Sequence, residues 1–139
     1  MTAYDQSNIF AKILRGEIPC VKIYEDEAAL AFMDIMPRAD GHALVIPKVP
    51  ARGILDMPPE RLGPYMQAVQ KVAAAVKTGM KAEGLTLQQF NESAGGQVVF
   101  HLHFHVLPRW DGVALRPHTG KMAPAESLED FAGRIRAAL

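Results

Sequence analysis

The segment from Phe100 to Val106 constrains the fold more than any other part of the chain. It reads Phe-His-Leu-His-Phe-His-Val, a strict alternation of apolar residues and histidines. Side chains alternate between the two faces of a β-strand, so this period predicts a strand and not a helix. One face is wholly apolar and is expected to pack on a helix; it carries Phe100, Leu102, Phe104 and Val106. The other face carries His101, His103 and His105.

The rest of the sequence predicts an α+β fold with an antiparallel sheet of about five strands. Short runs of apolar and β-branched residues, bounded by turn residues, mark the strands. The strands are expected over 21–25, 29–34, 42–47, 85–90 and 98–108. These runs form hairpins around one long helical stretch, which is typical of an antiparallel sheet covered by a helix.

Three helices are expected around this sheet. The longest begins at Pro58-Pro59 and ends at Gly84, because its apolar residues recur at three- and four-residue steps. A short helix capped by Ser7 or Asn8 precedes the first strand, and a helix over 127–139 closes the chain. No internal repeat or linker separates these elements, so residues 1–139 are expected to form a single domain.

Composition excludes several classes of protein. The 139 residues contain 15 Lys and Arg and 15 Asp and Glu, so there is no basic excess for broad nucleic-acid binding. The single cysteine, Cys20, forms neither an internal disulfide nor a Cys-x-x-Cys zinc site, which favours a reducing compartment. The N-terminus does not resemble a signal peptide, and the apolar runs are far shorter than the ~20 residues of a membrane span. We therefore expect a cytoplasmic protein without membrane association.

The three alternating histidines admit more than one chemistry. A metal ion is one interpretation, since histidine is the commonest metal ligand. However, the outer two Cα atoms of a straight strand lie ~14 Å apart, too far for all three rings to share an ion, and we do not favour a metal. Imidazoles ~7 Å apart along a strand are better suited to separate tasks along a phosphate-containing substrate. A neutral ring can attack phosphorus while a neighbouring ring donates to oxygen.

The motif resembles the signature of the histidine-triad (HIT) superfamily, His-x-His-x-His followed by two hydrophobic residues. Supporting segments are Ile18-Pro19, Phe32-Met-Asp34-Ile35, Gly41-His42-Ala-Leu-Val-Ile-Pro47-Lys48 and Gly96-Gln97. The resemblance covers about residues 8–110, and the helix over about 125–139 is a C-terminal extension. The resemblance implies a nucleotide hydrolase or nucleotidyl transferase that acts on a small nucleotide, with a purine expected as the base. Members of the family are usually homodimers. No cofactor and no resident metal are implied for this chain.

The same resemblance implies roles for individual residues. His103 would attack the α-phosphorus and form a nucleotidyl-histidine intermediate, with His101, His105 and His42 assisting. Asp34 would bind the ribose hydroxyls; the alternative is a turn-forming aspartate. Asn91 and Gln97 would contact phosphate. Residues implied around the base are Ile9, Phe10, Ile13, Phe32 and Ile35, for which plain core packing is an equal interpretation. His118 lies outside the motif and is expected on a surface loop.

The chain departs from the family pattern at three places. Many bacterial relatives have a Cys-x-x-Cys that contributes to a structural zinc site, where this chain has Asn8 and Ala11. Where relatives often place a histidine after Ile-Pro-Lys, this chain has Val49-Pro50. Val98 stands where some relatives have a serine or threonine that assists the leaving group, which predicts slower turnover of phosphoramidates.

Three functions therefore remain as hypotheses. The leading one is a metal-independent enzyme that hydrolyses a phosphoramidate or a dinucleoside polyphosphate at the α-phosphate. The second is a nucleotide-binding or interaction module whose hydrolysis is vestigial. The third is a histidine-ligated metalloenzyme.

Overall fold

The computed structural model describes residues 3–117 and 121–139. Its centre is a five-stranded antiparallel sheet with the order β1-β2-β3-β5-β4. The strands are β1 (Lys22–Glu25), β2 (Ala29–Met33), β3 (Ala43–Pro47), β4 (Gly84–Gln88) and β5 (Phe104–Arg109). The α+β fold predicted from the sequence is confirmed, with each expected strand present.

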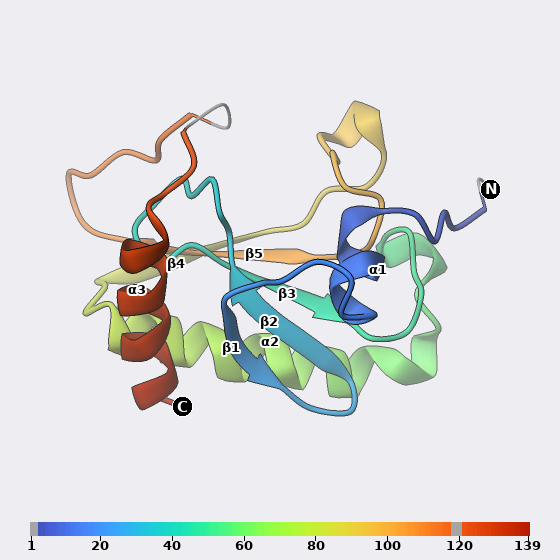
Figure 1. Ribbon diagram of the computed structural model, residues 1–139, viewed down its shortest axis with the longest axis horizontal. Coiled ribbons are helices and arrows are strands. Elements are labelled where there is room, and N and C mark those ends of the chain that lie inside the picture. Colours follow the sequence, from blue (N-terminus) through green and yellow to red (C-terminus); the bar gives the residue numbers. More distant parts are fainter. Residues whose placement is uncertain (1–2, 118–120) are drawn as a thin grey trace.

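Three helices surround the sheet, and all three were expected. They are α1 (Ile9–Leu14), α2 (Pro59–Gly79) and α3 (Ala125–Ala137). Asn8 caps α1, as predicted, because its side chain accepts a hydrogen bond from the Ala11 N–H. In Figure 1, α2 runs behind the sheet, α1 lies in front of it, and α3 stands at the opposite end from α1. Among the described residues, no helix has the length and hydropathy needed to cross a membrane.

The alternation along each strand divides the sheet into two faces. On β2 and β3, the small residues Ala29, Ala31, Ala43 and Val45 face the main core with the apolar stripe of α2. The intervening residues form a second apolar cluster with α1 on the other face: Phe10, Leu30, Phe32, Leu44 and Ile46. The core under α2 also receives Leu102 and Val106 from the histidine segment. The apolar half of the alternation therefore packs on the long helix as expected, except at Phe100, whose ring lies under the Arg52 guanidinium.

The strand predicted over 98–108 is shorter than expected, because residues 98–103 are irregular and β5 begins at Phe104. The neighbouring strands account for this boundary. Strand β4 ends at Gln88, directly opposite His105. The ladder with β3 stops at the pair of Val45 and Phe104, and before it the Leu102 N–H donates to the Ala51 carbonyl, outside the sheet. Only His105 of the three histidines therefore lies on a regular strand.

Two helix boundaries also differ from the prediction. Helix α2 ends at Gly79 and not at Gly84, which instead begins β4. At Gly79 the backbone of α3 comes so close that an added Cβ would lie 2.6 Å from the Arg134 carbonyl oxygen. Helix α3 begins at Ala125, two residues before the predicted start, after Pro124. His118 lies outside the described residues.

Candidate active site

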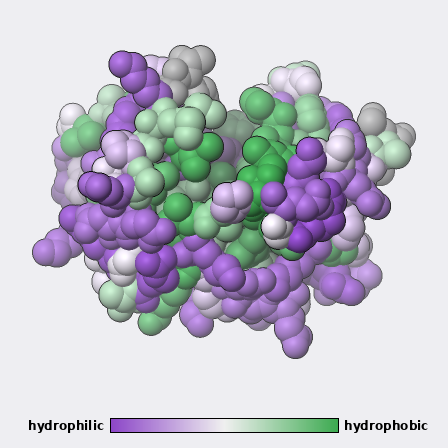
Figure 2. Space-filling model, in the orientation of Figure 1, coloured by the Kyte–Doolittle hydropathy of each residue, from purple (hydrophilic) through white to green (hydrophobic). Residues whose placement is uncertain are grey.

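The candidate site lies on the sheet face opposite α2, where three neighbouring strands present polar side chains. Asp34 follows β2, and its N–H donates to the His42 carbonyl at the start of β3. His105 on β5 pairs with Leu44, the next residue of β3 on the same face as His42. Hydrophobic residues gather in the hollowed middle of the face seen in Figure 2, flanked by hydrophilic surface. The sheet register thus brings Asp34, His42 and His105 together on an apolar face.

These three side chains form a compact polar cluster. Nε2 of His42 lies 3.0 Å from Nδ1 of His105 and 3.5 Å from a carboxylate oxygen of Asp34. Nδ1 of His42 accepts a hydrogen bond from the backbone N–H of Arg38 at 3.1 Å. Since Nδ1 is an acceptor, the proton of a neutral His42 ring is on Nε2, and it is directed at His105. In that arrangement a neutral His105 ring accepts at Nδ1 and carries its own proton on Nε2.

The same cluster is the group of described residues whose spacing approaches a metal site. One ligand atom from each of Asp34, His42 and His105 lies within 4.8 Å of the others. A neutral histidine that binds a metal through Nε2 carries its proton on Nδ1. In His42 that position faces the Arg38 N–H, a donor that needs a lone pair. His42 therefore does not fit as a metal ligand through Nε2 while its Nδ1 accepts from Arg38, and a hydrogen-bonded relay fits the cluster.

His103 is held in the opposite tautomer to His105. Its Nδ1 lies 2.7 Å from the backbone carbonyl oxygen of His101, which only accepts, so Nδ1 carries the proton. Nε2 of His103 is then the nitrogen with a lone pair. Burial lowers the pKa of His103, which keeps this ring neutral at pH 7. Such a ring has the electronic state of a nucleophile.

The imidazoles do not stand in the even row predicted from a straight strand. The ring centroids of His103 and His105 are 4.9 Å apart, closer than the expected spacing. His101 is fully buried and points into the protein, with Nε2 2.9 Å from the Pro47 carbonyl oxygen. The reason is the irregular backbone before Phe104, which removes His101 and His103 from the strand. His101 therefore supports His103 through its carbonyl, while its ring lies away from the cluster of Asp34, His42 and His105.

The residues expected around a base divide into buried and exposed members. Phe10 and Phe32 are buried and meet edge to face, with centroids 5.4 Å apart. Phe10 also contacts His103 edge to face at 4.9 Å. Ile13 packs against this cluster, whereas Ile9 and Ile35 are more than 40% exposed. Phe10 and Phe32 thus pack in the second core and also form one apolar wall beside His103.

Asp34 has features of both roles considered from the sequence, ribose binding and turn formation. One carboxylate oxygen accepts a hydrogen bond from the Met36 N–H at 2.9 Å, which is the turn role. The other faces His42. Burial raises the pKa of Asp34, because the charged form loses hydration. A carboxylate with one oxygen in a turn and one toward the cluster is placed to accept from a hydroxyl donor there.

The amides of Asn91 and Gln97 have protein partners. Gln97 accepts from the Glu92 N–H and donates to the carbonyls of Arg52 and Val99. Asn91 accepts from the Ile54 N–H and exchanges hydrogen bonds with Gln89. Both side chains therefore hold together the loop that leads into the histidine segment.

Two aromatic contacts of the histidines were not predicted. The phenol oxygen of Tyr4 lies 2.5 Å from Nδ1 of His101. The ring of Phe90 meets His105 edge to face, with centroids 5.6 Å apart. Phe90 could have been inferred from its place at the end of the fourth predicted strand. Nothing in the sequence pattern marks Tyr4, which precedes the first regular element.

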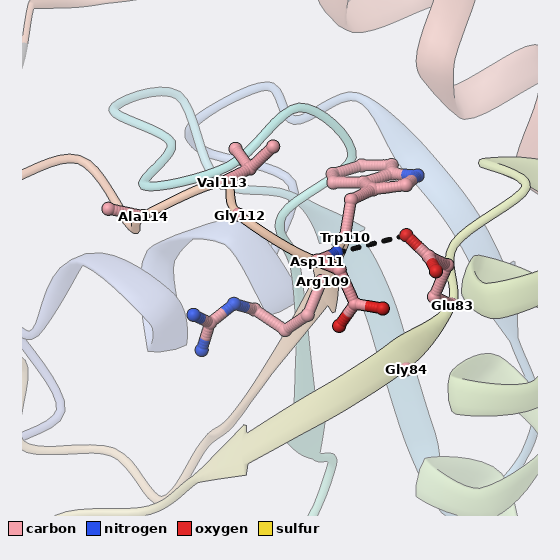
Figure 3. Close-up of a pocket in the computed structure, with 8 residues that line it drawn as sticks. All are labelled: Glu83, Gly84, Arg109, Trp110, Asp111, Gly112, Val113 and Ala114. Atoms are coloured by element: carbon pink, nitrogen blue, oxygen red, sulfur yellow. Dashed lines mark hydrogen bonds between the residues drawn. The ribbon is translucent and has the colours of Figure 1, made fainter.

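An open hollow of about 620 Å³ lies elsewhere on the molecule. Figure 3 shows its lining, from the start of β4 and the segment after β5, where Glu83 accepts a hydrogen bond from the Asp111 N–H. Trp110 donates its indole N–H to the Lys81 carbonyl and packs on the main core. The lining contains no histidine, so this hollow is separate from the candidate active site.

The chain is similar to known proteins over most of its length. A HIT-domain family model matches residues 15–112. A crystal structure of a HIT-like protein from Bartonella henselae, with an unknown ligand, is 54% identical; the match covers 99% of this chain and 100% of that chain, with a TM-score of 0.92. The adenosine 5'-monophosphoramidase hnt1 of Schizosaccharomyces pombe is 41% identical over 74% of this chain and 74% of its own length. A zinc-bound histidine-triad protein from Mycobacterium smegmatis is 34% identical over 96% of this chain and 93% of that chain, with a TM-score of 0.81. From its sequence and its fold, the chain belongs to the histidine-triad (HIT) family.

Proposed function

We propose that the protein is a nucleotide phosphoramidase or hydrolase that works through a nucleotidyl-His103 intermediate without a metal ion. The observation that carries the proposal is the hydrogen bonding of His103 and His105, which assigns opposite tautomers to the two neutral rings. Nδ1 of His103 donates to the His101 carbonyl, which leaves a lone pair on Nε2. Nδ1 of His105 faces the Nε2–H of His42, which leaves an N–H at Nε2 of His105. His103 is thus prepared to attack phosphorus, and the neighbouring His105 to donate to a phosphate oxygen.

The reaction then proceeds in two displacements. Nε2 of His103 forms a bond to the α-phosphorus as the bond from phosphorus to the leaving group breaks. The positive charge that develops on the ring is stabilised by the Nδ1–H bond to the His101 carbonyl. Water next attacks phosphorus and breaks the P–N bond, which restores the neutral ring and releases a nucleoside monophosphate. An amine leaving group takes its proton from solvent, since Val98, 84% exposed, offers no hydroxyl to supply it.

The relatives support the substrate class. The fission-yeast relative is named an adenosine 5'-monophosphoramidase, and the apolar wall of Phe10 and Phe32 suits a purine. We propose adenosine or guanosine phosphoramidates first and dinucleoside polyphosphates second. The homodimer implied by the family is also a proposal, and it is supported by the open edge of β4, where Leu87 is exposed.

Trapping the intermediate tests this function directly. The protein is mixed with labelled adenosine or guanosine phosphoramidate, quenched in alkali to preserve the P–N bond, digested and mapped by mass spectrometry. We expect one nucleotidyl group on His103 and none on a His103→Ala variant. Tight binding with neither turnover nor adduct would favour the nucleotide-binding module, which the internally bonded amides of Asn91 and Gln97 make the second candidate. Stoichiometric zinc or iron, with activity lost to a chelator, would favour the metalloenzyme instead.

The ribose assignment of Asp34 yields a separate prediction. A carboxylate that accepts from the 2' and 3' hydroxyls is expected to favour a ribonucleotide over its 2'-deoxy analogue about 10- to 100-fold in kcat/KM. In Asp34→Asn this preference is expected to fall to a few-fold, because the amide is a weaker, uncharged acceptor. The ratio of the two substrates is measured on each protein, so that any general effect of the substitution through His42 cancels. An unchanged ratio in the variant would show that Asp34 serves the turn alone.

A further inference from the structure

The segment before α1 is ordered by its own hydrogen bonds. The Ser7 N–H and hydroxyl both donate to a carboxylate oxygen of Asp5, at 2.8 and 2.6 Å. Asn8 donates its side-chain N–H to the Asp5 carbonyl at 2.8 Å and caps α1. The Arg15 guanidinium at the end of α1 donates to the Gln6 carbonyl at 2.9 Å. These bonds fix the position from which the preceding residue, Tyr4, reaches the histidines.

Tyr4 and Pro47 hold the His101 ring at both of its nitrogens. The Pro47 carbonyl, 2.9 Å from Nε2, only accepts, so Nε2 of His101 carries the ring proton. Nδ1 is then an acceptor, and the hydroxyl of Tyr4 donates to it at 2.5 Å. The two rings also meet edge to face, with an interplanar angle of 70°. This arrangement restricts both the tautomer and the rotation of His101.

The restriction passes to the nucleophile through the backbone. The His101 carbonyl accepts the Nδ1–H of His103 at 2.7 Å, and this bond selects the reactive tautomer. Phe10, in α1, contacts the His103 ring edge to face. The first 14 residues thus contact the first triad histidine through Tyr4 and the second through Phe10.

We propose that Tyr4 is a positioning residue for the nucleophile, acting through the His101 ring and carbonyl. The inference rests on the proposed role of His103. Tyr4 lies outside the part of the chain that the HIT-domain model matches, because that match begins at residue 15. The inference also gives the residues before α1 a function, which is to hold the ring of the first triad histidine.

Loss of the phenol hydroxyl has a defined physical consequence. Among the described residues, every buried side-chain nitrogen or oxygen has a hydrogen-bond partner. Without the hydroxyl, Nδ1 of a fully buried His101 ring lacks its donor, which is unfavourable. The ring is then expected to rotate or to admit water, and we expect either change to loosen the backbone of His101, whose carbonyl holds His103.

The test compares Tyr4→Phe with Tyr24→Phe. Tyr24 is also half-buried and donates its hydroxyl to Asp26 at 2.7 Å, but it lies on β1 and does not contact the histidines. We expect Tyr4→Phe to lower kcat about 10-fold with KM changed less than about 2-fold, and Tyr24→Phe to leave both unchanged. In ¹⁵N NMR spectra of the free proteins, the Nδ1 signal of His101 and the ring signals of His103 are expected to shift in Tyr4→Phe alone.

The outcomes separate this inference from the proposed function. If the His101 signals of Tyr4→Phe match those of the wild type, Tyr4 does not hold the ring and the inference is wrong. If they shift but kcat does not fall, in a protein whose His103 adduct has been trapped, Tyr4 is structural only and the inference is again wrong. Failure to trap the adduct on the wild type refutes the proposed function itself, and the NMR comparison still reports whether Tyr4 holds His101.

Discussion

Replacement of His103 by alanine is expected to lower kcat by about 10⁴-fold or more, the magnitude typical of losing a covalent nucleophile. The reason is that Nε2 of His103 forms the new bond to phosphorus in the proposed mechanism, and no other described ring is held in the same tautomer at that point. The measurement is steady-state hydrolysis of adenosine phosphoramidate and of a dinucleoside polyphosphate by the purified variant. Substrate affinity, measured by titration, is expected to change far less than kcat.

Two controls make this result specific. Circular dichroism and a thermal melt establish that the variant is folded, which matters because His103 is buried. His118→Ala removes the same residue type outside the triad motif and is expected to keep wild-type kcat. A folded His103→Ala protein with full activity on both substrates would refute the mechanism. A fall in kcat of only a few-fold would mean that His103 assists another nucleophile.

Acid is expected to destabilise the protein through His101. Burial lowers the pKa of this ring from 6.5 to about 4, so between these pH values the unfolded chain takes up a proton that the folded chain does not. The contribution of the neutral His101 ring to the unfolding free energy is therefore fully present above pH 6.5 and is lost as the pH falls toward 4. The shift corresponds to about 3 kcal/mol of unfolding free energy. His103, whose pKa is also lowered by burial, acts in the same direction.

Urea unfolding at several pH values between 7 and 4 checks this prediction. The matched variant is His101→Gln, which keeps an amide donor for the Pro47 carbonyl but does not titrate. Over the same interval its unfolding free energy is expected to fall by about 3 kcal/mol less than that of the wild type. Asp34, whose pKa is raised by burial, favours folding as the pH falls, but it contributes equally to both proteins. Parallel pH profiles for the two proteins would show that His101 is not the source of the acid sensitivity.

Local sequence patterns predicted most of the fold because they report local preferences. Apolar residues at helical spacing marked α2, and alternation at period two marked the strands. The errors lay at boundaries that depend on partners distant in sequence. Residues 100–103 alternate as a strand does, yet they are irregular because β4 ends at Gln88 and the ladder with β3 stops at Val45. Alternation determines which residues share a face, but a strand also needs a neighbour that offers hydrogen bonds.

The sequence predicted which residues belong to the candidate site better than it predicted how their side chains are arranged. The motif and the family resemblance selected His42, His101, His103 and His105 together with Asp34, and the sheet brings His42, His105 and Asp34 into one cluster. The amides of Asn91 and Gln97 have their hydrogen bonds inside the loop, an arrangement that depends on backbone groups of Arg52 and Ile54 about 40 residues away. No spacing rule reports such contacts.

The sequence by itself determined which residue types face each side of the sheet, since side-chain alternation is a property of the chain alone. It also predicted that histidine side chains, and not bulk positive charge, carry the chemistry of the protein. Only the tertiary structure decided the proton positions. The tautomers of His42, His101 and His103 depend on single backbone donors and acceptors at Arg38, Pro47 and His101, and that of His105 follows from its contact with His42. A ring proton goes to the nitrogen that faces an acceptor, and which nitrogen that is becomes defined only when distant segments pack together.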